Sequence, residues 1–544
     1  MALSQAFVFY LLTLLGLSCT GFVVPSLTTS QKINELWRIE RFTLHAQGYD
    51  RRRSFDRHDN RKNENADNGD PSIYVATCIP GLADVLAQEL TDLGSPYVET
   101  TGNAAVRFEA DLSTVLNILI WARTPHKIME LLSESPPSLE SRDDLYEYVR
   151  STIPVKEVLG DGKGGLLTMS VSTILNNPSK IPKDINHSHY TALTIKNALC
   201  DAVRDSRGDR PDVDTTNPDL PLVAVLRGLT GSGAQLSLYR QIHQGSLHRR
   251  GYRAFDSAIH KAAMKESLAS GLLLSAKWPQ TCKNGRRSRT PIVFVDPMAG
   301  SGTLLLEGLF MAANVAPHVL RLKCGLQPVL AQQYPPITRW KHHIDIALLW
   351  KDLLVDASAS AKKGLNYLRG QDDDRPITFI ANDFHPGALD LLHGSLSNAG
   401  VDSLVELQET DCRDLAPTSI PPNAAWNIFC NPPWGVRLTE DISESWESLR
   451  FFLRETCPEG TTAHVLSGNA EATRHLGLRR SSSLPVKVGQ VQMRWLEYKM
   501  EKPKSRDFQD GEGKPKHRQD GRKKQKKAVF RSTTVAVEDN EWIL

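Results

Sequence analysis

The chain has 544 residues, enough for two to four domains, and its 40% hydrophobic and 23% charged residues are ordinary for globular protein. The net charge is only +3, but residues 501–527 hold eleven Lys or Arg against five acids, so this stretch contributes +6 and the remainder is nearly neutral. The eight cysteines form no CxxC pair and no cluster with histidine. This pattern argues against a zinc site and against a disulfide framework, so we predict no metal and a reducing compartment.

The N-terminus is expected to be a targeting leader. Residues 6–17 form an apolar run of twelve, short for a membrane span and typical of a signal peptide. Residues 22–62 carry nine Lys or Arg against five acids, as a transit peptide would. The two parts together resemble the bipartite plastid leaders of algae with secondary plastids. Because a basic stretch before the apolar run is missing, a secretory signal or membrane anchor is the alternative, as is a cytoplasmic location.

No other segment approaches eighteen consecutive apolar residues, so we expect no stable membrane association once the leader is removed. Residues 50–71 are polar and charged and are expected to form a disordered linker. The first folded module follows this linker. Hydrophobic periodicity predicts its strands at 73–77 and 105–108 and its helices at 83–93 and 112–121.

A second small α+β unit is expected next along the chain. Its predicted helices cover 143–151 and 190–204, and its predicted strands cover 166–171, 222–227 and 234–239. The last two strands flank a glycine-rich turn and should pair as a hairpin.

A parallel α/β domain is predicted after that unit. A helix at 256–276 and a strand at 292–295 precede a glycine-rich loop, which opens a helix at about Ser301. Further strands are expected at 376–382, 404–408, 426–430, 462–466 and 490–496.

The glycine-rich loop reads DPMAGSGT, residues 296–303. Gly300 and Gly302 let the backbone pass close to a ligand, and the helix that follows can turn its free amides toward a carboxylate or ribose. Such loops also bind dinucleotides. Here Leu305 replaces the third glycine of GxGxxG, and no acid follows a second strand at the expected distance, so we do not predict a dinucleotide site.

Three acids, Asp296, Asp383 and Asp411, follow three successive predicted strands. They would therefore line one crevice at the carboxyl edge of the sheet. This set suits a cationic, ribose-containing ligand, with Asp296 beside an ammonium group, Asp383 accepting from ribose hydroxyls and Asp411 near an adenine amine. The alternative is that each acid caps the N-terminus of a helix.

The motif NPPW, residues 431–434, ends another predicted strand beside the same crevice. Pro432 and Pro433 lack N–H groups, so we expect their carbonyls to face the site without competing donors. The Asn431 side-chain oxygen and the Pro432 carbonyl would accept both hydrogens of an exocyclic amine, so catalysis would come from positioning. Trp434 would stack on a base, at roughly 1–3 kcal/mol. Taken alone, the motif also fits a Pro-Pro turn with a buried tryptophan.

These motifs, in this order, resemble the S-adenosylmethionine-dependent amino-methyltransferases that modify adenine N6 or guanine N2. Two further segments narrow the resemblance to THUMP-containing RNA methyltransferases. One is LHRRGYR (247–253), which is followed by a predicted helix with Lys265 and Glu266, and the other is ATCIPGLADVLAQELTDLG (76–94). It is closest to the single-domain type of large-subunit ribosomal RNA guanine-N2 methyltransferases and covers roughly residues 72–499.

The resemblance implies an α/β fold class: a Rossmann-like class I methyltransferase domain preceded by ferredoxin-like and THUMP α+β modules. The implied domains are a leader and linker (1–71), a ferredoxin-like module (72–135), a THUMP RNA-binding domain (136–245), a methyltransferase domain (246–500) and a basic tail (501–544). The implied cofactor, S-adenosylmethionine, would be bound by Asp296, Ala299, Gly300, Ser301, Gly302, Thr303, Asp383 and Asp411. The implied catalytic residues are Asn431, Pro432, Pro433 and Trp434. This chain departs from the family at Trp434, where Tyr is common, and at Ala299, where Cys is frequent.

The substrate implied by the resemblance is guanine N2 in RNA, with large-subunit ribosomal RNA as the first expectation. The target base must be unpaired or flipped, and residues 72–240 would read the shape of the RNA. The basic stretch 513–527 would add phosphate affinity, or is a solvated tail or nuclear-type signal. The alternatives are transfer RNA as substrate, adenine N6 as target, or a non-catalytic RNA-binding ribosome-assembly protein. The sequence predicts no oligomeric state.

Overall fold

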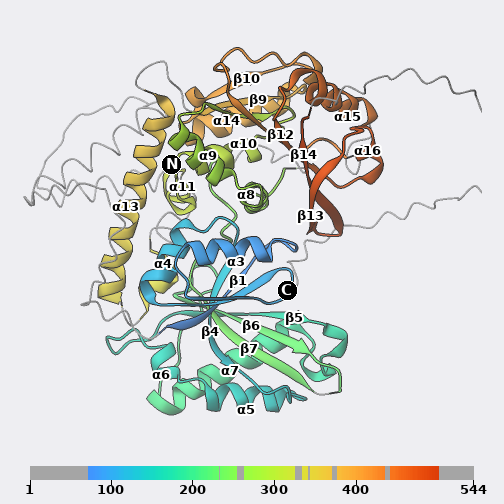
Figure 1. Cartoon of the computed structure of the whole chain (residues 1–544). Helices are drawn as coiled ribbons and strands as arrows, with labels where there is room; N and C mark the ends of the chain where they lie inside the picture. Colours follow the sequence, from blue (N-terminus) through green and yellow to red (C-terminus); the bar gives the residue numbers. More distant parts are fainter. Residues whose placement is uncertain are drawn as a thin grey trace, which may run out of the picture. The chain divides into compact units, whose positions relative to one another are not determined.

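The computed structural model describes residues 71–231, 233–253, 263–324, 334–340, 343–370, 377–434 and 442–501 (Figure 1). Three parts of the sequence interpretation lie outside these residues: the leader with most of its linker, the start of the helix expected at 256–276, and the basic tail. The described residues contain two seven-stranded sheets, which carry the two halves of the fold.

The first sheet has the strand order β2-β3-β1-β4-β7-β6-β5. Its strands are β1 (Ser72–Thr77), β2 (Tyr97–Thr100), β3 (Ala105–Ala110), β4 (Lys127–Glu134), β5 (Met169–Asn176), β6 (Leu220–Gly228) and β7 (Ala234–Gln241). The predicted hairpin is confirmed, because β6 and β7 pair antiparallel, while β5 runs parallel to β6. Strand β4 pairs with β1 on one side and β7 on the other, so the two expected α+β units share one continuous sheet.

Three strands of this sheet differ from the sequence prediction, and one of them, the short edge strand β2, was not predicted at all. Strand β5 begins at Met169, three residues later than expected, because the Leu167 amide instead donates to the Leu159 carbonyl. Strand β4 was not predicted either, since Lys127 and Glu130 break its alternation. The Glu130 carboxylate is paired across the sheet with Arg240, at 2.7 Å from its Nε, and this ion pair makes the charge tolerable on a nearly buried strand.

The α-helices of the first half are α3 (Ala83–Asp92), α4 (Leu112–Trp121), α5 (Arg142–Thr152), α6 (Val155–Val158) and α7 (Ser188–Arg207). Four of these five were predicted from the sequence, and the short α6 was not. Asp111 caps α4 by accepting from the Thr114 amide at 2.7 Å. Ser141 and Asp144 form a reciprocal capping box at the start of α5. These local caps explain why the sequence placed the helix starts well.

The second sheet has the order β10-β9-β8-β11-β12-β14-β13. Its strands are β8 (Ile292–Asp296), β9 (Ile377–Asn382), β10 (Val405–Gln408), β11 (Ala425–Cys430), β12 (Thr462–Ser467), β13 (Arg480–Val488) and β14 (Val491–Lys499). The first five strands in this order are parallel, and β14 joins antiparallel to β12. Every residue of β8 and β9 is buried, as expected for the centre of a parallel sheet that is covered on both faces.

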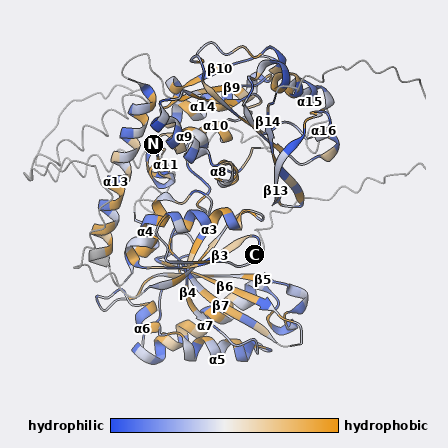
Figure 2. Ribbon diagram, viewed as in Figure 1, coloured by the Kyte–Doolittle hydropathy of each residue, from blue (hydrophilic) through white to orange (hydrophobic). Residues whose placement is uncertain are grey.

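Helices surround this second sheet. They are α8 (Glu266–Ser275), α9 (Trp278–Ser288), α10 (Thr303–Ala312), α11 (Pro317–Lys323), α13 (His343–Arg369), α14 (Pro386–Ala399), α15 (Ile442–Phe451) and α16 (Ala470–Arg474). Figure 2 shows hydrophobic and hydrophilic residues alternating along α13, which packs against α4 and α11. Among the described residues no single helix is long and apolar enough to cross a membrane; the bent pair α10 and α11 passes that test by length and composition alone.

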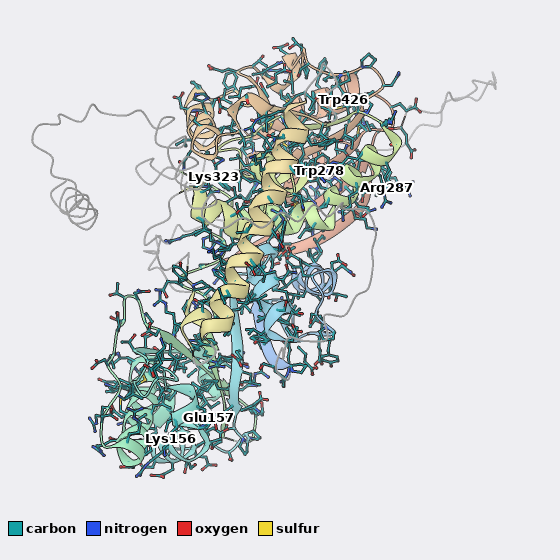
Figure 3. The ribbon with its side chains drawn as sticks, turned by 90° about the vertical axis from the view of Figure 1, so that its left-hand side faces the viewer. Lys156, Glu157, Trp278, Arg287, Lys323 and Trp426 are labelled. Atoms are coloured by element: carbon teal, nitrogen blue, oxygen red, sulfur yellow. The ribbon has the colours of Figure 1, made fainter. Side chains whose placement is uncertain are left out.

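A row of rings crosses one face of the second sheet. Phe379, Phe294, Phe429, His464 and Trp495 come from the neighbouring strands β9, β8, β11, β12 and β14. Burial lowers the pKa of His464 to about 4, so this ring is neutral and acts as an aromatic core residue. Trp278 at the start of α9 covers the row edge-on and donates from Nε1 to the Gly308 carbonyl at 2.8 Å (Figure 3). By packing together, these rings hold the five strands, and therefore their carboxyl ends, in fixed positions relative to one another.

The half of the fold with the first sheet is joined to the half with the second sheet by backbone contacts. The Lys487 amide of β13 donates to the Pro80 carbonyl at 2.9 Å. Gly81, at φ +98°, lies so close to Pro485 that an added Cβ would be 2.2 Å from its carbonyl oxygen. Residues 79–82 (IPGL) therefore pack closely against β13.

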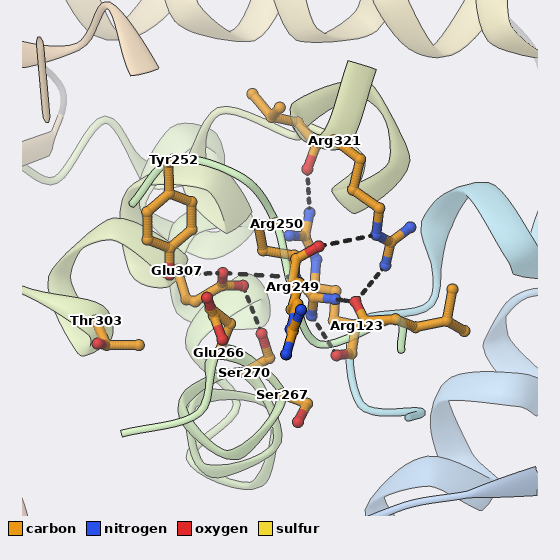
Figure 4. Close-up of polar contacts among 12 residues, drawn as sticks. Arg123, Arg249, Arg250, Tyr252, Glu266, Ser267, Ser270, Thr303, Glu307 and Arg321 are labelled. Carbon is orange, nitrogen blue, oxygen red and sulfur yellow. Dashed lines mark hydrogen bonds and ion pairs between the residues drawn. The ribbon is translucent and has the colours of Figure 1, made fainter. Parts of the chain in front are cut away.

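Buried arginines form a second junction, drawn in Figure 4. Arg250 is fully buried, donates to the carbonyls of Leu247 and Arg123, and lies 3.6 Å from the Glu307 carboxylate of α10. Arg123, which follows α4, donates in turn to the Val315 carbonyl at 2.6 Å. Main-chain carbonyls accept hydrogen bonds from both guanidinium groups and the Glu307 carboxylate faces Arg250, so the LHRRGYR segment is held between the two halves of the fold.

Candidate active site

Four polar side chains follow four neighbouring parallel strands. In sheet order these are Asp411 after β10, Asp383 after β9, Asp296 at the end of β8 and Asn431 after β11. Since parallel strands end at the same edge, the structure brings together all four positions that the sequence singled out. Strand β8, which ends in Asp296, lies between the strands that lead to Asp383 and Asp411 on one side and β11 with the NPPW motif on the other. This is where the strand order reverses, the usual place of a ligand crevice in such sheets.

The glycine-rich loop has the expected open shape with one correction. Gly300 and Gly302 have φ of +54° and +74°, and an added Cβ on Gly302 would come within 2.1 Å of Leu392. The space around Gly300 is open, because a Cβ added there would meet nothing within 4 Å. Helix α10 starts at Thr303, not at Ser301, because the left-handed Gly302 delays it. Ala299 is buried, with its amide donating to the Asn382 carbonyl at 2.8 Å.

Thr303 links this loop to the LHRRGYR segment. Arg253 donates from Nη2 to the Thr303 hydroxyl at 2.7 Å and lies 3.7 Å from the Glu266 carboxylate. Glu307, one turn further along α10, accepts from the Ser270 hydroxyl at 2.6 Å and the Tyr252 hydroxyl at 3.2 Å (Figure 4). The sequence placed Thr303 at the ligand but did not reveal these contacts.

Asp296 is a buried carboxylate in need of a cationic partner. It is only 1% exposed, and within the described residues its one hydrogen bond comes from the Met298 amide at 3.4 Å. Burial raises its pKa well above the ordinary range, and the charge of Asp383 adds to this effect. A bound cation would compensate the cost of ionising it.

Asp383 ties two strand ends together. Its Oδ2 accepts from the Gly300 amide at 2.7 Å and its Oδ1 from the His385 amide at 2.9 Å. Each carboxylate oxygen has a second acceptor site, so both oxygens can still receive a hydroxyl. The following residue, Phe384, is 77% exposed, which is unusual for so large an apolar side chain. Sequence reasoning missed Phe384, although an aromatic residue directly after a strand-end acid was a signal.

Asp411 is held differently from the other two acids. It accepts from the Arg413 backbone amide, Nε and Nη2 at 2.8, 3.0 and 2.8 Å, and it caps the short turn that follows. These bonds lower its pKa below the ordinary value. In the structure Asp411 therefore caps the N-terminus of this short turn, as the alternative interpretation of the sequence predicted. A contact with an adenine amine stays a prediction.

Asn382, the last residue of β9, holds the three acid-bearing ends in register. It is 1% exposed; its Nδ2 donates to the carbonyls of Pro297 and Thr410, both at 3.0 Å, and its Oδ1 accepts from the Thr410 amide at 3.2 Å. Every polar atom of this side chain therefore bridges β9 to a neighbouring strand end. The sequence showed it only as part of a strand.

The NPPW motif has contacts that the sequence did not reveal. Trp434 donates from Nε1 to the Asn431 side-chain oxygen at 3.1 Å. Because an indole N–H can only donate, this bond fixes which end of the Asn431 amide faces the ring. The expectation that both proline carbonyls are unengaged is wrong for Pro433, whose carbonyl accepts from the Trp446 indole at 2.6 Å. The Pro432 carbonyl has no donor among the described residues.

The loop after β12 supports the tryptophan from behind. A Cβ on Gly468 would lie 2.7 Å from the Trp434 ring, so only glycine leaves room for the indole. Asn469 donates from Nδ2 to the Trp434 carbonyl at 3.2 Å while its oxygen caps α16. This fifth strand end completes the edge, and Gly468 and Asn469 were not identified from sequence.

Family models match three consecutive parts of the chain. They are described as an RlmL ferredoxin-like domain (residues 74–129), a THUMP domain (142–229) and an RMKL-like methyltransferase domain (250–497).

Whole-chain relatives agree with these matches. The chain is 31% identical over 432 residues to "Putative RNA methyltransferase slr0064" of Synechocystis, covering 78% of this chain and 96% of that protein. It is 29% identical over 435 residues to ribosomal RNA large subunit methyltransferase K/L of Pseudomonas entomophila, covering 79% of this chain and 52% of the relative. The K/L protein of Cellvibrio japonicus is 32% identical over 416 residues, with 75% and 48% covered. The chain thus spans about half the length of the K/L proteins.

Solved structures share the fold. A "possible methylase" from Clostridium difficile 630 aligns with a TM-score of 0.61 at 19% identity, covering 80% of this chain and all of that one. A "putative methyltransferase complexed with SAH" aligns with a TM-score of 0.61 at 18% identity, covering 80% and 99%. The chain therefore belongs to the RMKL-like methyltransferases that carry RlmL ferredoxin-like and THUMP domains, a family that takes its methyl group from S-adenosylmethionine.

Proposed function

We propose that this chain methylates the exocyclic N2 of a guanine in RNA, with large-subunit ribosomal RNA as the substrate. The observation that carries the proposal is the position of Asn431 on the strand next to Asp296, at the same edge of the sheet. An acceptor for an amine and a buried anion for a cation thus lie side by side. The ribosomal RNA named for the K/L relatives supports this choice of substrate.

The residues of the three acidic strand ends fit S-adenosylmethionine. The buried Asp296 has one long hydrogen bond among the described residues, and the space over Gly300 is open. When bound, the cofactor supplies a methyl group activated by a positively charged sulfur. Asp296 would hold its ammonium group, Asp383 its ribose hydroxyls, and Asp411 its adenine amine. Phe384 would give the adenine an apolar surface.

Asn431 would hold the target amine. A carbonyl oxygen has two acceptor sites, so the Asn431 oxygen can accept one amine hydrogen while it keeps its bond from Trp434. The Pro432 carbonyl would accept the second hydrogen. An amine held by both hydrogens has its lone pair directed away from them and toward the cofactor side, which lowers the barrier by orientation.

The RNA substrate must present an unstacked base to this edge. The cost of flipping, a few kcal/mol, would be offset partly by stacking on Trp434, worth about 1–3 kcal/mol. The THUMP domain would read RNA shape. Transfer RNA, adenine N6 and a non-catalytic role in ribosome assembly are the competing functions. A plastid is the proposed compartment, from the leader.

The test is mass spectrometry of modified nucleosides after incubation of the protein with S-adenosylmethionine and cytosolic or organellar RNA. We expect N2-methylguanosine in ribosomal RNA, and a comparison of cytosolic with organellar RNA shows which of the two the protein methylates. Asn431→Ala should lose methyl transfer and keep cofactor affinity by calorimetry. Asn427→Ala, four residues earlier on the same strand, is the matched control and should keep both, since its amide contacts the nearby Ala425 carbonyl at 3.2 Å. Full turnover by Asn431→Ala would refute the proposed mechanism, and N6-methyladenosine would refute the proposed base.

A further inference from the structure

A large hollow lies beside the NPPW motif, at the carboxyl end of β12. Its volume is about 600 Å³, and it is formed by the loop after β12 together with α16, β13 and β14. Three of its lining side chains are arginines, Arg474 of α16, Arg480 of β13 and Arg494 of β14. We call it the arginine hollow.

The arginine hollow has an uncompensated positive charge. None of its lining residues is Asp or Glu, and the three arginines are exposed and have no carboxylate partner within salt-bridge distance among the described residues. A second hollow, in the THUMP part of the chain, differs in that its charges are paired. Its lining residue Arg210 lies 2.6 Å from Asp201, which also pairs with Arg204. Of these two hollows, the arginine hollow is therefore the one that offers its guanidinium groups to an external anion.

The arginine hollow shares residues with the wall of the candidate active site. Gly468 and Asn469 line it, and the same two residues contact the ring and the carbonyl of Trp434. Arg494 is opposite Ser467, the last residue of β12, in the sheet register. Neighbouring strands are about 4.8 Å apart, so this arginine is one strand spacing from the strand end that supports Trp434.

We infer that the arginine hollow binds phosphodiester groups of the RNA next to the target nucleotide. This inference rests on the proposed function, because it takes the nucleic acid from it. Guanidinium groups match phosphate oxygens with two parallel hydrogen bonds, and three of them can follow a bent backbone. A base flipped out of the stack stays in that position only if its sugar-phosphate backbone is held. Phosphate contacts in the hollow beside Trp434 would hold this backbone without recognising the base sequence.

The test compares the wild-type protein with a variant that combines Arg474→Gln, Arg480→Gln and Arg494→Gln. The control is Arg287→Gln, an exposed arginine of α9 that is labelled in Figure 3 and does not line the arginine hollow. The probe is a short single-stranded RNA with one guanosine, measured by fluorescence anisotropy over a range of salt concentrations. A second probe has the same sequence with neutral methylphosphonate linkages.

The triple variant should bind the charged probe about tenfold or more weakly, and its slope of log affinity against log salt should be shallower by about 2, since each lost phosphate contact removes about 0.7. The basic tail is present in both proteins and cancels. Arg287→Gln should match wild type, and calorimetry should give unchanged affinity for S-adenosylmethionine. A wild-type slope in the triple variant overturns the inference. Equal weakening on the neutral probe also overturns it, because the arginines would then not act on phosphate.

These binding results are independent of which base is methylated. If the wild-type protein makes no N2-methylguanosine, the proposed function fails while the comparison of slopes still decides the role of the arginine hollow. If N2-methylguanosine is formed and the slopes agree, the arginine hollow alone is refuted.

Discussion

Trp434→Phe separates two roles of the aromatic wall. The substitution keeps a flat ring over Gly468 and removes the N–H that donates to the Asn431 oxygen at 3.1 Å. A neutral hydrogen bond contributes about 0.5–1.5 kcal/mol net. If that bond orients the Asn431 amide in the transition state, its loss should lower kcat roughly two- to twelvefold. The affinity for S-adenosylmethionine should not change, since the cofactor position that we propose is on the side of the three acids.

Trp434→Ala is the companion variant, because it removes the ring as well. Stacking is worth about 1–3 kcal/mol per base, so this variant should also raise KM for RNA roughly five- to 150-fold. The assay is methyl transfer to ribosomal RNA under steady-state conditions, with kcat and KM determined separately. A wild-type kcat for Trp434→Phe combined with a raised KM for Trp434→Ala would show that the ring acts by stacking alone, and the orienting role would be refuted.

Three other variants probe the same edge. Asp296→Asn should weaken binding of S-adenosylmethionine in calorimetry and stabilise the ligand-free protein. Burial raises the pKa of Asp296 in the folded state, so the wild-type protein loses stability as pH rises above the ordinary value of 3.8. Thermal unfolding of the variant as a function of pH should lack this loss. Gly468→Ala should displace the Trp434 ring and reduce methyl transfer, whereas Gly394→Ala, with open space around it on α14, should not; equal activities would contradict the packing argument. Phe384→Ala should weaken cofactor binding without lowering the melting temperature, because the side chain is 77% exposed; an unchanged affinity would remove Phe384 from the site.

The strand ends could be predicted from sequence because their signals are local. Asp296, Asp383 and Asn431 each end a short β-branched or apolar run, and a parallel sheet brings such ends to one edge whatever the order of its strands. The sheet order itself was not predicted, since it depends on pairings between segments far apart in the chain.

Partners distant in sequence explain what was missed. Strand β4 carries Glu130, whose charge is neutralised by Arg240 more than a hundred residues later. Strand β13 contains serines and Pro485, as a strand at the edge of a sheet can, so its composition reads as a loop. The Trp446 bond to the Pro433 carbonyl and the support of Trp434 by Gly468 likewise join separate elements. Periodicity cannot reveal such pairs, because it describes only neighbours along the chain.

The buried Arg250 restricts how this protein can be recombined with its relatives. Its guanidinium donates to the Arg123 carbonyl from one half of the fold and faces Glu307 from the other. A chimera that takes its RNA-binding half from another protein must therefore keep the 247–253 segment together with the same backbone path at residue 123 and an acid at 307. A graft joined on either side of that segment without them would leave a cation enclosed and unpaired, a defect of about 3–5 kcal/mol. RNA specificity can therefore be exchanged by domain grafting only if the 247–253 segment and positions 123 and 307 are transferred together.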